Sequence, residues 1–128
     1  MSLQQRRIGA FVATAQPDRA RAFYSDVLGL RLVLEHGFAM VFDAGGTTLR
    51  IQKVRELVPQ PFTTLGWIVD DIEAEVDALT ARGVTFMRVE GLPQDARGIW
   101  TPADGQKVCW FKDPDGNTLS LNTPERAP

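Results

Sequence analysis

The chain has 128 residues, 44% of them hydrophobic and 23% charged, which is enough for one domain with a buried core and excludes a disordered or fibrous chain. Fourteen Lys and Arg residues against 16 Asp and Glu residues give a net charge of −2, without the positive excess that nucleic-acid binding requires. One cysteine and one histidine exclude an intrachain disulfide and any zinc site built from several Cys or His ligands.

The first half predicts one strand, one helix and then three strands. Apolar and β-branched residues indicate a strand at 7–14. The helix is predicted over about 17–28, because Pro17 suits a first helical turn and Gly29 suits the residue after the last turn. Its apolar positions recur at a helical spacing and are Ala20, Phe23, Tyr24, Val27 and Leu28. Strands separated by turn residues follow at 30–35, 38–43 and 47–53.

A connector without periodicity, 55–63, contains Pro59 and Pro61 and leads into the second half. A strand is predicted at 64–69, followed by a helix over about 71–82 that opens at an Asp-Asp pair and ends before Gly83. The apolar positions of this helix are Ile72, Val76 and Leu79. Further strands are predicted at 84–89, 97–101, 106–112 and 117–122.

The two halves repeat the same order of elements, and the segment 46–52 in the first half parallels 116–122 in the second. The prediction is an α+β fold, a single domain over 1–128 made of two βαβββ modules in tandem, at about 5–54 and about 62–123. Because one helix covers only one face of each sheet, two curved mixed sheets with helices on their outer faces can enclose a shared cleft.

Three stretches of the chain resemble the vicinal oxygen chelate superfamily, which includes glyoxalase I, extradiol dioxygenases, fosfomycin-modifying enzymes and bleomycin-binding proteins. They are Ala20–Leu30, the segment from Val69 through Val84, and Trp110–Asn117, of which the last is the most specific. The resemblance covers nearly the whole chain, and it implies the same two-module fold.

The resemblance also implies where a metal-dependent member would hold its ion, at four strand positions that correspond here to Gly9, Arg50, Thr64 and Ser120. Gly9 has no side-chain donor, Arg50 is a cation, and the two neutral hydroxyls are poor ligands for a divalent ion. A register shift of one residue in either direction brings no Asp, Glu or His to these positions. We therefore expect no metal and no other cofactor.

Period-2 alternation predicts which neighbours share the cleft with these positions. Phe11 lies beside Gly9, and Trp110 is expected opposite Ser120 across the hairpin that contains Asp113 to Gly116. The predicted ligand-binding residues are Arg50, Phe11, Gln52, Thr64, Trp110, Ser120 and Asn122. Aromatic surface with a few polar groups is typical of a site for a small aromatic or anionic ligand.

Several residues allow two interpretations. Arg50 either pairs with an acidic residue or extends to water along its aliphatic stem, or it binds a carboxylate or phosphate of a ligand. Trp67 and Trp100 are interpreted as core residues. His36 is interpreted as a solvated turn residue, and Cys109 as a buried, unreactive thiol rather than a nucleophile.

The sequence therefore predicts a metal-independent small-molecule-binding protein, with no catalytic residue assigned. One alternative is a glyoxalase- or dioxygenase-type enzyme with non-standard site residues, and another is a regulatory domain that acts through protein contacts. The polar N-terminus and the lack of a run of about 20 apolar residues predict a cytoplasmic protein without a membrane partner. Exposed sheet edges, together with the resemblance, predict a homodimer.

Overall fold

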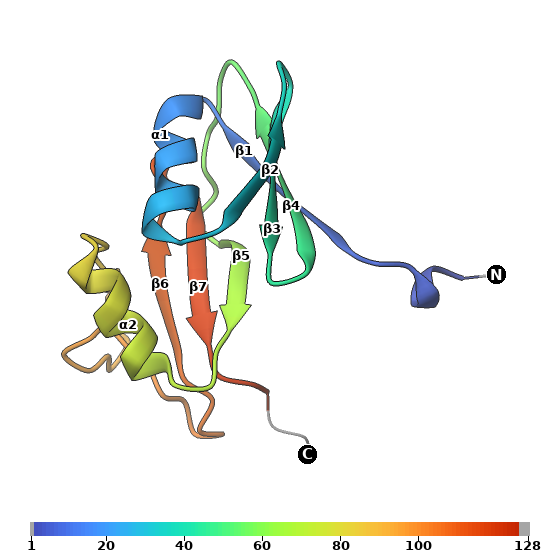
Figure 1. Ribbon diagram of the computed structural model, residues 1–128. Helices are drawn as coiled ribbons and strands as arrows, with labels where there is room; N and C mark the ends of the chain where they lie inside the picture. Colours follow the sequence, from blue (N-terminus) through green and yellow to red (C-terminus); the bar gives the residue numbers. More distant parts are fainter. Residues whose placement is uncertain (1, 126–128) are drawn as a thin grey trace. The chain divides into compact units, whose positions relative to one another are not determined.

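A computed structural model describes residues 2–125 and divides the chain into two units, Met1–Val58 and Pro59–Pro128 (Figure 1). Each unit combines one mixed sheet with one helix, so the α+β prediction with a repeated sheet-and-helix module is confirmed. Within the described residues, no helix is long and apolar enough to cross a membrane.

The first unit contains a four-stranded sheet in the order β1-β4-β3-β2. Its elements are β1 (Gly9–Thr14), α1 (Pro17–Ala22), β2 (Arg31–Glu35), β3 (Ala39–Ala44) and β4 (Thr47–Lys53). β1 runs parallel to β4, and the two other neighbouring pairs are antiparallel. All four predicted strands of this half are confirmed, with boundaries within two residues.

The predicted helix at 17–28 is confirmed, but its second part is wider than an α-helix. Pro17 begins α1, and a π-helical turn follows over Phe23–Val27, which the Leu28 amide closes by donating to the Phe23 carbonyl at 2.9 Å. Gly29 then ends the helix with φ +73°, a backbone conformation that favours glycine. Tyr24 is fully buried and packs its ring 6.1 Å from that of Phe42 on β3, so the helix covers this face of the sheet.

The second unit contains a three-stranded sheet in the order β5-β7-β6. Its elements are β5 (Thr63–Ile68), α2 (Ile72–Ala81), β6 (Val108–Lys112) and β7 (Thr118–Asn122). β5 and β7 are parallel, whereas β6 and β7 are antiparallel. The Asp71 carboxylate caps α2 by accepting from the Ala74 amide at 3.1 Å, and the three predicted apolar positions of this helix are buried.

The prediction of a strand at 84–89 is wrong. The side chain of Gln94, rather than the backbone of a neighbouring strand, bonds part of this segment. Only Phe86 bridges to Phe111, and the Met87 amide bonds the Trp110 carbonyl. Beyond that point the Gln94 side chain bonds the backbone of this segment, accepting from the Val89 amide at 2.6 Å and donating to the Met87 carbonyl at 2.9 Å. It also donates to the Gly98 carbonyl at 2.8 Å. The ladder therefore stops after one bridge.

The prediction of a strand at 97–101 is also wrong. Trp100 exchanges two backbone hydrogen bonds with Val108, at 2.9 and 3.0 Å, but the pairing does not extend further. Gly98 on one side has φ +89°, and Pro102 on the other side has no amide hydrogen to donate. The segment between α2 and β6 is consequently held by side chains and turns rather than by a ladder.

Three local interpretations are confirmed. His36 lies in the exposed β2–β3 turn, where its Nδ1 accepts from the Phe38 amide at 3.2 Å. Cys109 is fully buried on β6, and burial raises the pKa of its thiol to about 12. Trp67 is half-buried on the same face as Cys109, with its ring stacked 6.5 Å from that of the buried Phe111, so it faces the core as predicted.

Candidate functional site

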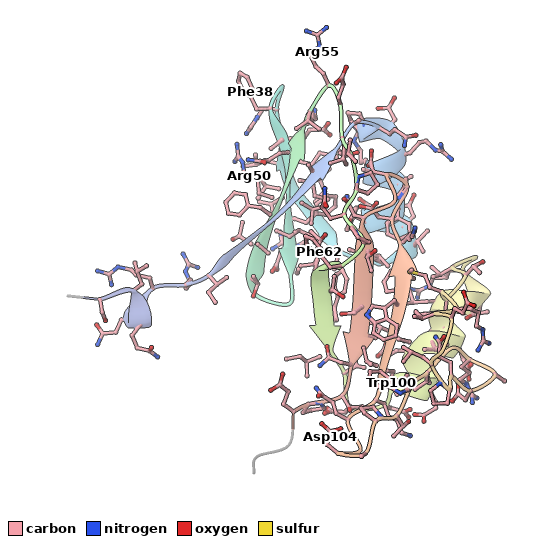
Figure 2. All side chains as sticks on the ribbon, turned by 180° about the vertical axis from the view of Figure 1, so that it is seen from behind. Phe38, Arg50, Arg55, Phe62, Trp100 and Asp104 are labelled. Carbon is pink, nitrogen blue, oxygen red and sulfur yellow. The ribbon has the colours of Figure 1, made fainter. Side chains whose placement is uncertain are left out.

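The face of the first sheet opposite α1 carries three of the predicted ligand-binding residues. The register pairs Phe11 with Arg50 and Ala13 with Gln52. Because alternate residues of a strand share a face, Phe11, Arg50 and Gln52 lie together on it. Figure 2 shows the Arg50 side chain pointing away from the helix of this unit.

Arg50 is half-buried on this face. Within residues 2–125, no carboxylate forms an ion pair or a hydrogen bond with its guanidinium. Three other arginines do form ion pairs, Arg21 with Glu35, Arg31 with Asp43 and Arg97 with Asp77. The described part of the chain therefore does not show Arg50 paired with an acidic residue. The two other interpretations, extension of the side chain to water and binding of a ligand, stay open.

Phe11 is 57% exposed, and its ring borders the space beside Gly9. A Cβ atom built at Gly9 would lie 3.6 Å from the Phe11 Cε2 atom, which is an ordinary contact distance. The first of the four expected metal positions thus offers the edge of an aromatic ring and no ligand atom.

The second sheet carries the other four predicted residues, and Ser120 lies at their centre. Ser120 of β7 pairs with Trp110 on β6 and with Gly66 on β5. The predicted position of Trp110 opposite Ser120 is therefore confirmed. Ser120 is buried, and a Cβ atom at Gly66 would collide with its hydroxyl.

Thr64 and Asn122 lie farther along the strands. Thr64 falls in an irregularity of the β5–β7 ladder, so it has no direct partner on β7, and Gly66 takes the place opposite Ser120. Asn122 closes β7 and donates from Nδ2 to the Thr123 carbonyl at 3.0 Å. Of these predicted residues, Trp110 is the one that pairs directly with Ser120.

A cavity of about 490 Å³ opens in the second unit beside Trp110. Its lining is mainly apolar and consists of Pro61, Phe62, Thr63, Met87, Val89, Leu92, Trp100, Trp110, Lys112 and Thr118. Cavities of this size hold small organic ligands. Of the predicted ligand-binding residues, Trp110 is the one that lines it.

Trp100 stacks on Trp110, with ring centroids 6.3 Å apart and an angle of 25° between the planes. The expectation that Trp100 belongs to the core is therefore wrong, since Trp100 is half-buried and lines the cavity. Sequence alternation could not place it, because its segment pairs through one residue rather than as a strand. Phe62 and Met87 were missed for the same reason, since they lie outside regular strands or at their ends.

Lys112 gives the cavity its charge. No Asp or Glu is among the lining residues, and within the described chain Lys112 has no ion-pair partner. An ammonium group at the edge of an apolar cavity favours a ligand with a negative charge.

The residues at the four expected metal positions do not fit a metal ion. Thr64 and Ser120 supply neutral hydroxyls, Gly9 supplies no side chain, and Arg50 repels a cation. Within residues 2–125, no three His, Cys, Asp or Glu side chains come together as a metal site.

Comparisons with known proteins agree with this fold. A family model described as the Glyoxalase/Bleomycin resistance protein/Dioxygenase superfamily matches residues 7–121. The chain is similar in structure to a bleomycin resistance determinant encoded on the transposon Tn5, with 19% identity, a TM-score of 0.74 and coverage of 95% of this chain and 100% of that one. No curated protein matches the chain.

Two further solved structures are similar over nearly their whole length. A putative glyoxalase family protein from Bacillus anthracis has 17% identity and a TM-score of 0.73, covering 98% of this chain and 99% of that one. A lactoylglutathione lyase from Agrobacterium tumefaciens has 22% identity and a TM-score of 0.68, covering 95% and 96% respectively. At these identities the likeness concerns the fold.

Proposed function

The chain belongs to the Glyoxalase/Bleomycin resistance protein/Dioxygenase superfamily, and from this membership we propose that it binds a small organic molecule that combines a flat aromatic part with a negative charge. The observation that carries the proposal is the stacked pair of Trp100 and Trp110 in a cavity whose charged residue is Lys112. Figure 2 shows Trp100 at the end of this unit.

The stacked pair supports an aromatic ligand because indole rings offer large, rigid surfaces. An offset or edge contact between aromatic rings contributes about 0.5–1.5 kcal/mol beyond the burial of area. Phe62 and Met87 extend the apolar wall, and a thioether adapts to rings of different shape. The Lys112 ammonium then favours a carboxylate or a similar anion on that ligand.

We also propose that ligand binding needs no metal ion. The donor set at the four expected positions supports this, because a guanidinium occupies one of them and none supplies a carboxylate or an imidazole. The alternative remains a glyoxalase- or dioxygenase-type enzyme with unusual site residues. Elemental analysis of the purified protein separates the two, since about one equivalent of tightly bound metal would contradict metal-independent binding.

The remaining predicted residues are proposed as further ligand contacts. In the first unit these are Arg50, Phe11 and Gln52, where a ring and an unpaired guanidinium lie on one sheet face. In the second unit they are Thr64, Ser120 and Asn122, which supply hydroxyl and amide groups. If Arg50 binds the anion of the ligand, Arg50→Ala weakens ligand binding by about 2–5 kcal/mol. Arg50→Lys weakens it less, because an ammonium group keeps the charge but cannot present two parallel donors to a carboxylate.

A homodimer and a cytoplasmic location remain predictions. Support for a dimer comes from apolar side chains left exposed on the strands, such as Ile68 at 70% and Leu34 at 49%. Burial of such side chains against a second copy would remove them from water.

The aromatic-anion proposal is tested with three matched probes, 1-naphthoate, 1-naphthylmethylammonium and cyclohexanecarboxylate, in calorimetric titrations. We expect 1-naphthoate to bind most tightly, because it alone has both an aromatic ring and a negative charge. Trp100→Ala should weaken naphthoate binding by about three- to tenfold, the equivalent of the lost ring contact. Lys112→Gln should remove the preference for naphthoate over the ammonium probe.

Phe38→Ala is the matched control, since it removes an aromatic side chain that is 79% exposed and does not line the cavity. This variant should bind naphthoate like the unmodified protein. Tighter binding of the ammonium probe, or equal losses in Trp100→Ala and Phe38→Ala, would refute the proposed ligand class. Turnover of the bound probe would favour the enzyme alternative.

A further inference from the structure

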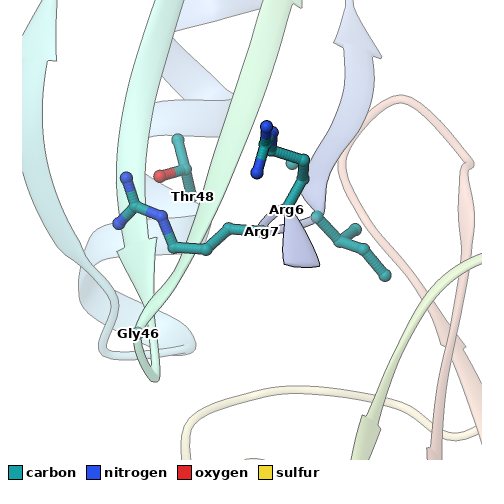
Figure 3. Close-up of a pocket in the computed structure, with 6 residues that line it drawn as sticks. Arg6, Arg7, Gly46 and Thr48 are labelled. Atoms are coloured by element: carbon teal, nitrogen blue, oxygen red, sulfur yellow. The ribbon is translucent and has the colours of Figure 1, made fainter. Parts of the chain in front are cut away.

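A second cavity, of about 330 Å³, lies in the first unit at the start of β1 (Figure 3). It forms where the chain enters this strand next to the turn between β3 and β4. Its lining residues are Arg6, Arg7, Ile8, Gly9, Gly46 and Thr48. Because β1 and β4 are parallel and pair Gly9 with Thr48, the entering segment runs beside the start of β4.

Two consecutive arginines supply the donors of this cavity. Figure 3 shows the Thr48 side chain between the guanidinium groups of Arg6 and Arg7 in this view. Within residues 2–125, neither guanidinium forms an ion pair or a hydrogen bond. Two permanent positive charges and a hydroxyl group thus line one cavity without an internal counter-charge.

The nearest carboxylate by register is Asp43, which pairs with Thr48 across the β3–β4 ladder. Its Oδ1 accepts from the Gly46 amide at 2.8 Å, and its Oδ2 accepts from Arg31 at 3.1 Å. These two contacts, the amide first, hold the pKa of Asp43 below its ordinary value. Asp43 is therefore already neutralised by Arg31, and no Asp or Glu lines the cavity.

We propose that this cavity binds the phosphate group of a phosphate monoester. Two guanidinium forks and one hydroxyl offer more donors than the two oxygens of a carboxylate can accept, whereas a phosphate group presents three free oxygens and about two negative charges. The proposal rests on the first unit alone. It is independent of the aromatic cavity of the second unit, so the two proposals stand or fall separately.

The phosphate can belong to a soluble metabolite or to a lipid headgroup. Ile8, which lines the cavity, is 81% exposed, and Leu3 is 84% exposed on the same segment. Exposed apolar side chains next to two consecutive arginines would suit a membrane surface that carries anionic lipids. The shared chemistry is the phosphate monoester, and separate arms of the experiment distinguish its sources.

The experiment is a ¹⁵N–¹H NMR titration of the full chain with inorganic phosphate, with sodium chloride added to keep the ionic strength constant. We expect saturable shifts of the Gly46 and Thr48 amides. Arg6→Gln and Arg7→Gln should each weaken binding by about two- to fivefold, which is the range for solvent-exposed ion pairs, and the double variant should abolish saturation. Sodium acetate at the same concentrations should bind more weakly than phosphate.

Arg55→Gln is the matched control, because it removes the same charge from an exposed residue of the same unit that does not line the cavity (Figure 2). Its phosphate affinity should equal that of the unmodified protein. The second arm measures sedimentation of the protein with phosphatidylcholine vesicles, with and without phosphatidic acid. Binding that requires both phosphatidic acid and the two arginines identifies a lipid headgroup as the source of the phosphate. If the vesicles do not bind the protein, the source is a soluble phosphate monoester. Shifts that do not saturate, equal effects in all three single variants, or equal affinity for acetate would overturn the proposal.

Discussion

Gly66 and Ser120 provide a sharp test of the second sheet, because the Ser120 hydroxyl occupies the space that a Cβ atom at position 66 would need. Gly66→Ala places a Cβ atom against the Ser120 hydroxyl, while the Ser120 carbonyl and Cβ atoms lie 3.4 and 3.7 Å away, at ordinary contact distances. Overpacking of a filled site costs about 1–3 kcal/mol. Alanine is preferred over glycine in a strand by about 0.5–1 kcal/mol, so the expected net loss of stability is about 0–2.5 kcal/mol.

The Ser120→Ala background removes the colliding oxygen, so Gly66→Ala should there be neutral or slightly stabilising. Urea unfolding followed by tryptophan fluorescence measures all four members of this double-mutant cycle, with an expected coupling of about 1–3 kcal/mol. Gly37→Ala is the matched control, since nothing lies within 4 Å of a Cβ atom there. An equal change in stability in both backgrounds, and therefore no coupling, would show that Ser120 does not restrict this position.

Three further predictions follow from buried or paired groups and from exposed surface. The Cys109 thiol, whose pKa burial raises to about 12, should resist iodoacetamide at pH 8 in the native protein and react in urea; rapid native labelling would contradict its burial. Arg21 first, and then Lys53, lower the pKa of Glu35 from 4.5 to about 2, so its contribution to stability is complete above pH about 4.5 and is lost as the pH falls towards 2. The stability difference between the unmodified protein and Glu35→Gln should therefore shrink over that pH range in urea titrations, and a constant difference would refute the ion pair. Analytical ultracentrifugation at micromolar concentration should show a dimer, and a stable monomer would refute that prediction.

Local chemistry determined the helices and most strands of this protein. Pro17 and Gly29 mark the limits of the first helix because each restricts or permits a particular φ angle. Alternation within strands also determined which side chains share a face, so Trp110 could be placed opposite Ser120 from the hairpin register alone. These properties depend on residues close together in the chain or paired through a short turn.

The register between non-adjacent strands was decided by tertiary structure. The irregularity in β5 puts Gly66 rather than Thr64 opposite Ser120, and no local signal marks where a parallel ladder skips a residue. The family resemblance therefore shows which residues stand at the four expected metal positions. It does not show that Gly66 packs against Ser120, because that contact depends on the pairing of β5 with β7 in the folded sheet.

Both cavities depend on residues that are distant in the chain and lie outside long strands. Gln94 replaces a strand partner for 87–89, which converts a segment with a strand-like sequence into a wall of the aromatic cavity and brings Trp100 onto Trp110. In the first unit, Arg6 and Arg7 gain Thr48 as a neighbour only because β1 pairs in parallel with β4. The sequence by itself determined most helices and strands of this protein and which side chains share a face of each strand. Side-chain hydrogen bonds and long-range strand pairing decided where its cavities form, because the free energy of these interactions arises only on folding.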